Sequence, residues 1–214
     1  TFDEAPGDLQ LFKAYSDALV YADYVAGKPR ADTAARLEKV ARRFVKSRES
    51  DPDAYELSAA YLEGKGMFGA AATLLSDLAD STTLDAKIAM ALARNQLSQS
   101  RTAEAATHFS LAAQLSACSA KTVGPILDEL ERVARLDLAV DIVRECARRF
   151  PKDAYLHVVY ARVLLAGAGG TTEDGTALGH LQKAVSINAG LLEEAASLLF
   201  ANGDGEAAWP FLEI

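Results

Sequence analysis

Small and apolar residues recur along this chain at a nearly constant interval. Successive members of the series lie about 34 residues apart. The positions that set this interval are Ala59, Ala93, Leu127, Ala161 and Ala196. Each of them is followed at a similar distance, somewhat longer in the fourth case, by a second alanine: Ala71, Ala105, Ala139, Ala177 and Ala208. A constant interval of this length indicates an array of similar structural units.

The spacing inside each unit is that of a pair of helices. A bulky residue lies four positions after the second alanine, and in most units a small residue lies three further on, as at Phe109 and Ala112. These spacings place the side chains on one helix face. Polar or glycine-containing breaks at 64–66, 98–101, 134–137, 166–175 and 202–205 suit short helix–helix turns. The break at 166–175 is the longest, so we expect a mobile loop there.

This unit resembles the tetratricopeptide repeat, a helix–turn–helix of about 34 residues. The residues that carry the resemblance are Leu92, Ala93, Ala105, Phe109 and Ala112, and a second unit matches at Ala177, Leu181 and Ala184. The aromatic residue that is typical of the first helix is mostly missing, because Ala89 and His157 occupy its position. The resemblance implies an all-α fold, a right-handed α-solenoid of antiparallel helix pairs with about 12 helices.

The same resemblance divides the chain into a divergent N-terminal helix pair at 1–52 and repeats at 53–214. The repeat limits are about 53–83, 84–118, 119–152, 153–188 and 189–214, the last of them truncated. Asp53 and Asp153 follow prolines at the unit boundaries, and we expect them to cap the helices that start there.

In this family the first helices of successive units line a concave groove. Carried over position by position, the groove residues are Lys87, Met90, Arg94, Lys121, Asp128, Tyr155, Val158, Arg162 and Phe200. Arginine pairs with carboxylates and carbonyls, and methionine and aromatic residues supply apolar contact, so an extended peptide or an amphipathic helix is the expected guest. The Lys/Asn arrangement with which some members grip chaperone C-termini is absent, which argues against that ligand.

The chain stops inside the second helix of its last unit. Solenoids normally have a polar helix that covers the final apolar face. We therefore expect Trp209, Phe211 and Leu212 to be left partly bare, and either a longer native chain or a docked neighbour to cover them.

Charge narrows the classes of partner. The net charge is −8, which repels polyanions and argues against nucleic-acid binding.

Half of the residues are hydrophobic, yet no apolar run approaches the roughly 18 residues that a membrane span requires. No secretory signal is present, although the chain begins at Thr1, which leaves open both an exported protein that has lost a leader and an excised fragment.

One segment is basic, although the chain as a whole is acidic. Arg36, Lys39, Arg43 and Lys46 recur at helical spacing opposite apolar residues. The favoured interpretation of this basic stripe is the solvated face of an amphipathic helix. The alternative is a surface for an acidic partner or for lipid phosphates.

Few residues in the sequence are candidates for catalysis or for binding a cofactor or metal. His108 and His180 occupy equivalent positions, which predicts that both point outward, whereas His157 is expected to be a packing residue in the core. The glycine-rich segment 167–170 follows a helix and not a strand, so it does not have the context of a phosphate loop. We find no catalytic motif, cofactor site or metal site, and expect no enzymatic activity and no cofactor.

The two cysteines, Cys118 and Cys146, lie on apolar helical faces. The favoured interpretation is two free cysteines that pack as small hydrophobic residues, and a disulfide between them is the alternative.

These observations favour a protein–protein interaction scaffold that binds a peptide or a helix in the groove or at the C-terminal end. Two alternatives remain: a regulatory or targeting arm of a longer enzyme, and a subunit of a larger complex joined by repeat stacking.

Overall fold

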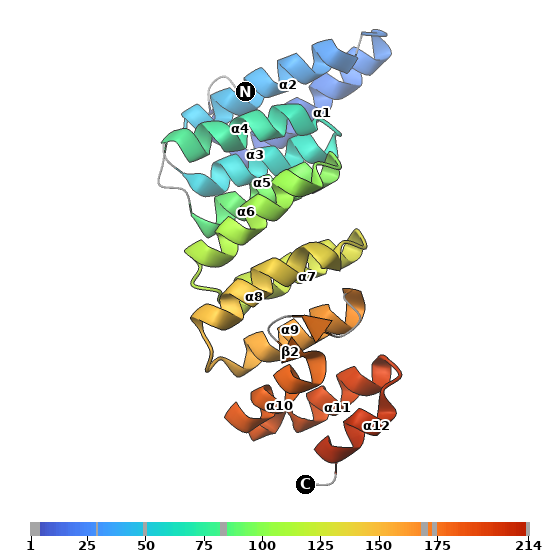
Figure 1. Ribbon diagram of the computed structural model, residues 1–214. Helices are drawn as coiled ribbons and strands as arrows, with labels where there is room; N and C mark the ends of the chain where they lie inside the picture. Colours follow the sequence, from blue (N-terminus) through green and yellow to red (C-terminus); the bar gives the residue numbers. More distant parts are fainter. Residues whose placement is uncertain are drawn as a thin grey trace. The chain divides into compact units, whose positions relative to one another are not determined.

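The computed structural model describes residues 5–28, 30–48, 51–81, 85–167, 171–172 and 175–212. Over these residues the chain forms twelve α-helices, three short 3-10 helices and one two-stranded ribbon (Figure 1). The expected all-α class is confirmed. None of the helices in these ranges is long and apolar enough to cross a membrane. The chain divides into two compact units, Thr1–His108 and Phe109–Ile214, with α6 spanning the boundary.

Unit 1 consists of helix pairs that pack in sequence order. Its helices are α1 (Leu9–Val25), α2 (Arg30–Lys46), α3 (Pro52–Gly64), α4 (Phe68–Ser81), α5 (Ala86–Ser98) and the start of α6 (Thr102–Leu115). Each of the first four packs on the next one along the chain. Phe12 of α1 stacks on Phe44 of α2 with ring centroids 4.6 Å apart, and the edge of Tyr61 meets Phe12 at 5.4 Å. These rings join the first three helices into one core.

Unit 2 continues the pattern with a short ribbon inserted. It contains α7 (Ala120–Arg132), α8 (Ala139–Arg149), α9 (Ala154–Gly167), α10 (Ala177–Ile187), α11 (Leu192–Ala201) and α12 (Gly205–Ala208). The 3-10 helices are Leu136–Leu138, Ala189–Leu191 and Trp209–Phe211. Where the sequence predicted a long loop, β1 (Thr171–Thr172) pairs antiparallel with β2 (Gly175–Thr176). The glycines at 168–170 lie outside the described residues.

The repeating small residues form the contacts between helices. All ten positions that define the repeat pattern, from Ala59 to Ala208, are 3% exposed or less. A small side chain at most of these positions lets two helix backbones approach closely. The interval of about 34 residues in the sequence therefore marks residues that are buried in the core.

Three of the turns inside helix pairs share one backbone conformation. Gly66, Ser100 and Ala134, again one repeat apart, all have positive φ, at 72°, 60° and 56°. The N–H of the next residue then donates to the carbonyl five positions earlier, as from Arg101 to Gln96 at 2.9 Å and from Arg135 to Leu130 at 2.7 Å. This is the Schellman arrangement that satisfies the last carbonyls of a helix.

At the N-terminus of α3, the capping residue differs from the one expected from the sequence. Asp51, and not Asp53, caps α3: its carboxylate accepts from the Asp53 N–H, and Pro52 takes the first helical position. Proline is favoured there because its missing N–H has no helical partner to lose. Asp153 precedes α9 as expected and accepts from the Leu156 N–H at 3.3 Å.

The C-terminal end is only partly bare. Trp209 is 58% exposed and Leu212 is 48% exposed, but Phe211 is 7% exposed and belongs to the core. The expectation for Phe211 was wrong because the chain tightens into a 3-10 turn at Trp209–Phe211, which packs against α11.

Candidate interaction face

The groove residues expected in unit 1 all lie on α5 but differ in accessibility. Lys87 is exposed, with its ammonium nitrogen 3.6 Å from a carboxylate oxygen of Asp53 on α3. Arg94 is half-buried. Met90 is 6% exposed and cannot serve as a groove contact. The reason is that α5 is buried around most of its circumference, with every residue from 88 to 93 in the interior.

In unit 2 the expected groove residues lie on the first helices α7, α9 and α11. The hydroxyl of Tyr155 on α9 lies against Gly124 of α7, where an added Cβ would be 3.2 Å away. Arg162 of α9 forms an ion pair with Glu131 of α7. Lys121 and Asp128 on α7 and Phe200 on α11 are exposed. Val158 is not, at 3% exposure, because α9 packs on both α8 and α10.

Tyr155 experiences charges from all three of these helices. Burial raises the pKa of its phenol, Arg162 lowers it, and the carboxylates of Asp128 on α7 and Glu194 on α11 raise it. The side chain nevertheless remains 36% exposed. We call the surface made by Asp128, Tyr155, Arg162, Glu194 and Phe200 the first-helix face. It presents charged groups of both signs around Tyr155, and a second exposed aromatic ring, that of Phe200, on the helix that carries Glu194.

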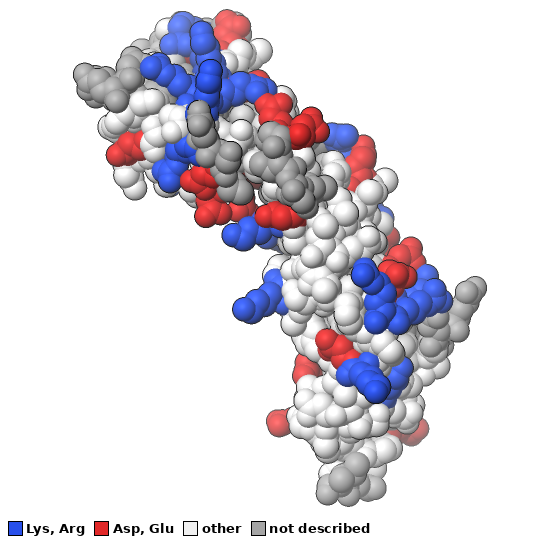
Figure 2. Space-filling view, turned by 90° about the vertical axis from the view of Figure 1, so that its left-hand side faces the viewer, with Lys and Arg blue, Asp and Glu red and all other residues white. Residues whose placement is uncertain are grey.

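The basic stripe lies on the outer face of α2. Its four members, Arg36, Lys39, Arg43 and Lys46, are exposed, while Leu37 and Phe44 on the opposite face are buried. Figure 2 shows Lys and Arg side chains gathered over unit 1, in the upper part of the view. Arg36 is not available as a free cation, because it pairs with the buried Asp23 of α1.

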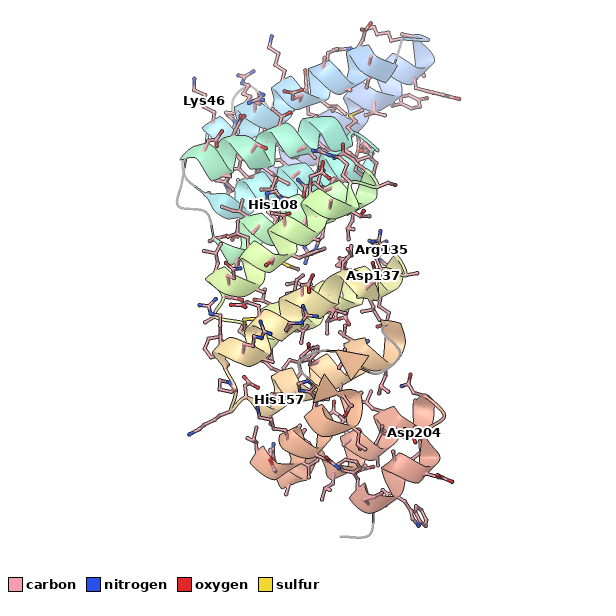
Figure 3. All side chains as sticks on the ribbon, viewed as in Figure 1. Lys46, His108, Arg135, Asp137, His157 and Asp204 are labelled. Atoms are coloured by element: carbon pink, nitrogen blue, oxygen red, sulfur yellow. A yellow bond between two sulfur atoms is a disulfide. The ribbon has the colours of Figure 1, made fainter. Side chains whose placement is uncertain are left out.

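Two histidines meet in the interior of unit 2 (Figure 3 labels His157). The Nδ1 atoms of His157 and His180 are 3.1 Å apart, and His157 Nε2 is 3.0 Å from the carbonyl oxygen of Pro151. The expectation that His180 points outward was wrong: it is 8% exposed and its ring lies 4.3 Å from that of Tyr160. His108 is half-buried beside Gln96, with Nδ1 2.9 Å from the side-chain oxygen.

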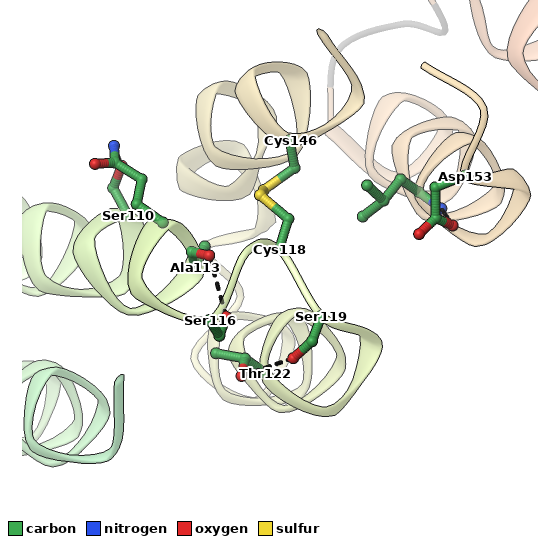
Figure 4. The surroundings of a disulfide bond; sticks show 10 residues. Ser110, Ala113, Ser116, Cys118, Ser119, Thr122, Cys146 and Asp153 are labelled. Carbon is green, nitrogen blue, oxygen red and sulfur yellow. Dashed lines mark hydrogen bonds between the residues drawn. A yellow bond between two sulfur atoms is a disulfide. The ribbon is translucent and has the colours of Figure 1, made fainter. Parts of the chain in front are cut away.

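Cys118 and Cys146 form a disulfide, so the favoured expectation of free cysteines was wrong (Figure 4). Their Cα atoms are 5.6 Å apart, well within the range that a disulfide spans. Cys118 lies in the turn between α6 and α7, and Cys146 lies on α8. Cys118 is held there by a φ of 55° and by donation of its N–H to the Ala113 carbonyl at 2.7 Å.

Sequence reasoning did not favour the disulfide, which it gave only as the alternative, and it missed the histidine pair. Neither the disulfide nor the histidine pair has a spacing that predicts it. Across the described ranges, no three His, Cys, Asp or Glu side chains are placed to hold a metal ion. The side chains of the first-helix face are suited to recognition by charge, hydrogen bonds and aromatic contact.

No protein-family model matches the chain, and no curated protein does. Among solved structures, MamA residues 41 to the end from Desulfovibrio magneticus RS-1 is similar at 14% identity, with a TM-score of 0.42 and 74% of this chain and 89% of that one covered. The C-terminal part of a TPR repeat-containing protein from Cytophaga hutchinsonii is similar at 12% identity, with a TM-score of 0.48 and coverages of 91% and 76%. From its own helix pairs and its buried repeat pattern, the chain has a tetratricopeptide-repeat-like, all-helical fold.

Proposed function

We propose that this chain is a non-catalytic protein–protein interaction scaffold, and that the first-helix face of unit 2 holds a peptide or a helix of its partner. The observation that carries the proposal is the position of Tyr155. It is a partly exposed aromatic side chain with charged groups of α7, α9 and α11 around it. Aromatic and arginine side chains in such settings supply most of the binding energy at protein interfaces.

The composition of the first-helix face defines the kind of contact. Phe200 is 49% exposed and offers a second apolar anchor on the helix that carries the carboxylates of Glu193 and Glu194. Arg162 already has a carboxylate partner in Glu131, so it presents an oriented guanidinium and not a mobile one. Oriented polar groups around apolar anchors suit an extended peptide or an amphipathic helix.

Site-specific photocrosslinking tests this proposal directly. A photoreactive amino acid is introduced at position 155 or 200, or at Gln182 as the control, which is exposed on α10 outside the face. After irradiation in cells of the source organism, we expect a discrete protein adduct from positions 155 and 200 and none from 182. The adduct from position 200 should weaken when Arg162→Ala is added.

Two outcomes would reject the first-helix face. One is the absence of any adduct from both positions 155 and 200 while all three proteins remain folded by circular dichroism. The other is an identical set of adducts from all three positions, which would show contact without preference for this surface.

A further inference from the structure

A cavity of about 340 Å³ opens in unit 1. It lies where the α1–α2 turn and the α3–α4 turn come to the same end of the unit (Figure 1). We call it the turn-end cavity, and its lining residues are Val20, Tyr24, Lys28, Thr33, Lys65 and Met67. Its volume is at the small end of the range for ligand pockets, about 300 to 1,000 Å³. It can hold one large side chain.

The rim of the cavity carries the greatest apolar exposure in the part of the chain that the structure describes. Tyr24 is 82% exposed, Tyr21 is 70% exposed and Val25 is 65% exposed, all within one turn and a half of α1. Single exposed apolar residues are ordinary, but a contiguous group beside a cavity marks a binding surface. Apolar side chains of the lining, among them Val20 and Met67, extend this surface inward.

Positive charge lies on the same rim. The Lys28 ammonium is 3.0 Å from the Asp23 carboxylate, and the Lys65 ammonium is 2.7 Å from that of Asp17. Asp23 also pairs with Arg36, so among these five paired groups the cations outnumber the carboxylates by one. This local balance contrasts with the net charge of −8 for the whole chain.

Lys28 can pair with a ligand without leaving a buried charge unpaired. Asp23 is 2% exposed, and its burial would be costly without a cation. Arg36 provides that cation independently of Lys28. The Lys28 side chain is 44% exposed. Its ammonium has three N–H donors, and its contact with Asp23 occupies one of them.

We infer that the turn-end cavity binds an apolar side chain from an acidic segment of a partner protein. The side chain fills the cavity between Val20, Tyr24 and Met67, and carboxylates on either side of it pair with Lys28 and Lys65. A membrane surface fits less well, because a bilayer cannot enter a concave cavity of side-chain size and two lysines attract anionic lipid weakly.

The test uses the full chain and a set of terminally blocked decapeptides, each with a central Leu, Phe or Trp flanked by two Glu on both sides. Binding is measured by fluorescence anisotropy. At least one peptide should bind saturably, and replacing its central residue by Ser should weaken binding about tenfold or more, the loss typical of a buried anchor. Replacing Glu by Lys in the peptide should abolish binding.

Matched variants of the protein locate the binding. Tyr24→Ser should weaken binding about fivefold or more, whereas Ile187→Ser, which also replaces an exposed apolar residue but lies on α10 of unit 2, should leave it within about twofold. Lys28→Gln should weaken binding and reduce its dependence on salt, and Lys39→Gln should not. All four sites are exposed, so circular dichroism and melting should be unchanged.

Three outcomes would overturn the inference. The first is no saturable binding by any peptide of the set. The second is equal loss of affinity in Tyr24→Ser and Ile187→Ser. The third is binding to vesicles of phosphatidylglycerol and phosphatidylcholine with none to the peptides, which would assign the surface to lipid.

Discussion

The Nδ1 atoms of His157 and His180 face each other at 3.1 Å in the interior of unit 2. Because the Pro151 carbonyl can only accept, His157 Nε2 carries the proton that it donates there, and His157 Nδ1 is left to accept from His180. A proton on His157 Nδ1 would reverse this bond and require His180 to carry its own proton on Nε2. Burial of His157 favours its neutral form, and with it the first arrangement.

The stability of unit 2 should fall as the pH is lowered below about 6.5. Burial lowers the pKa of His157 below its ordinary 6.5, the Pro151 carbonyl and Asp153 oppose this, and Lys183 adds to it. The unfolded chain then binds a proton before the folded chain does, so the free energy of unfolding decreases as the pH falls through this range. Above about pH 7.5 this contribution is fully present. Urea denaturation at about pH 7.5 and 5.5 measures the loss.

His157→Gln isolates this contribution from that of the carboxylates. The variant should lose less stability between the two pH values than the natural protein. The control is His108→Gln, which removes a half-buried histidine outside the pair and shows what loss of one histidine elsewhere in the chain does to the same measurement. Parallel pH profiles for the natural protein and His157→Gln would contradict the assignment.

The disulfide should contribute about 3 to 4 kcal/mol to the free energy of unfolding. The figure follows from the chain entropy lost when residues 28 apart in sequence are joined in the unfolded state. The double variant Cys118→Ala/Cys146→Ala should be less stable by about this amount. Its urea midpoint should not respond to a thiol reductant, whereas that of the natural protein should drop. An unchanged urea midpoint of the natural protein in the presence of the reductant would contradict this prediction.

Ala134→Gly should stabilise the chain by about 0.5 to 1 kcal/mol. Ala134 has a φ of 56°, which is unfavourable for an L-residue but not for glycine. Glycine already occupies the equivalent position at Gly66, where φ is 72°. The control Ala60→Gly, exposed within α3, should instead destabilise by about 1 kcal/mol. Thermal melting of both variants provides the comparison, and a lower melting temperature for Ala134→Gly would contradict it.

Asn95→Ala should cost about 1 to 3 kcal/mol, the penalty for leaving buried polar groups without partners. Asn95 is fully buried, and its amide donates to Glu63 at 2.7 Å and to the Phe68 carbonyl at 3.1 Å. These bonds join α5 to the end of α3 and the start of α4. Asn202→Ala, which removes an exposed amide that donates to the Leu198 carbonyl of its own helix, should change stability by less than about 0.5 kcal/mol. Equal effects of the two changes on urea denaturation would rule out this role.

The helix pairs could be predicted from the sequence because the information is local and repeated. Ala59, Ala93 and Ala161 have equivalent environments, so the repeat interval specifies both burial and helix order. The accessibility of Met90 and Val158 could not be predicted in this way. A position in a repeat gives the direction of a side chain, but not how many neighbouring helices cover that direction.

The long-range links were predicted least well, for a geometric reason. The disulfide depends on a left-handed turn at Cys118 that brings its sulfur to α8. The number of residues between the two cysteines does not reveal how far apart they lie in space. His180 points inward because α10 begins directly after the ribbon and turns this position toward Tyr160. A longer break at 166–175 was visible in the sequence, but not the two-stranded pairing that fills part of it.

The covalent bond between the α6–α7 turn and α8 has a consequence for how this protein is made. Bacterial cytosol keeps thiols reduced, so material produced there would be a mixture of bridged and unbridged molecules that differ in mass only by the two thiol hydrogens. Thiol titration of each preparation distinguishes them. Affinities measured before that titration would average over two populations, of which only one has the turn tethered to the helix.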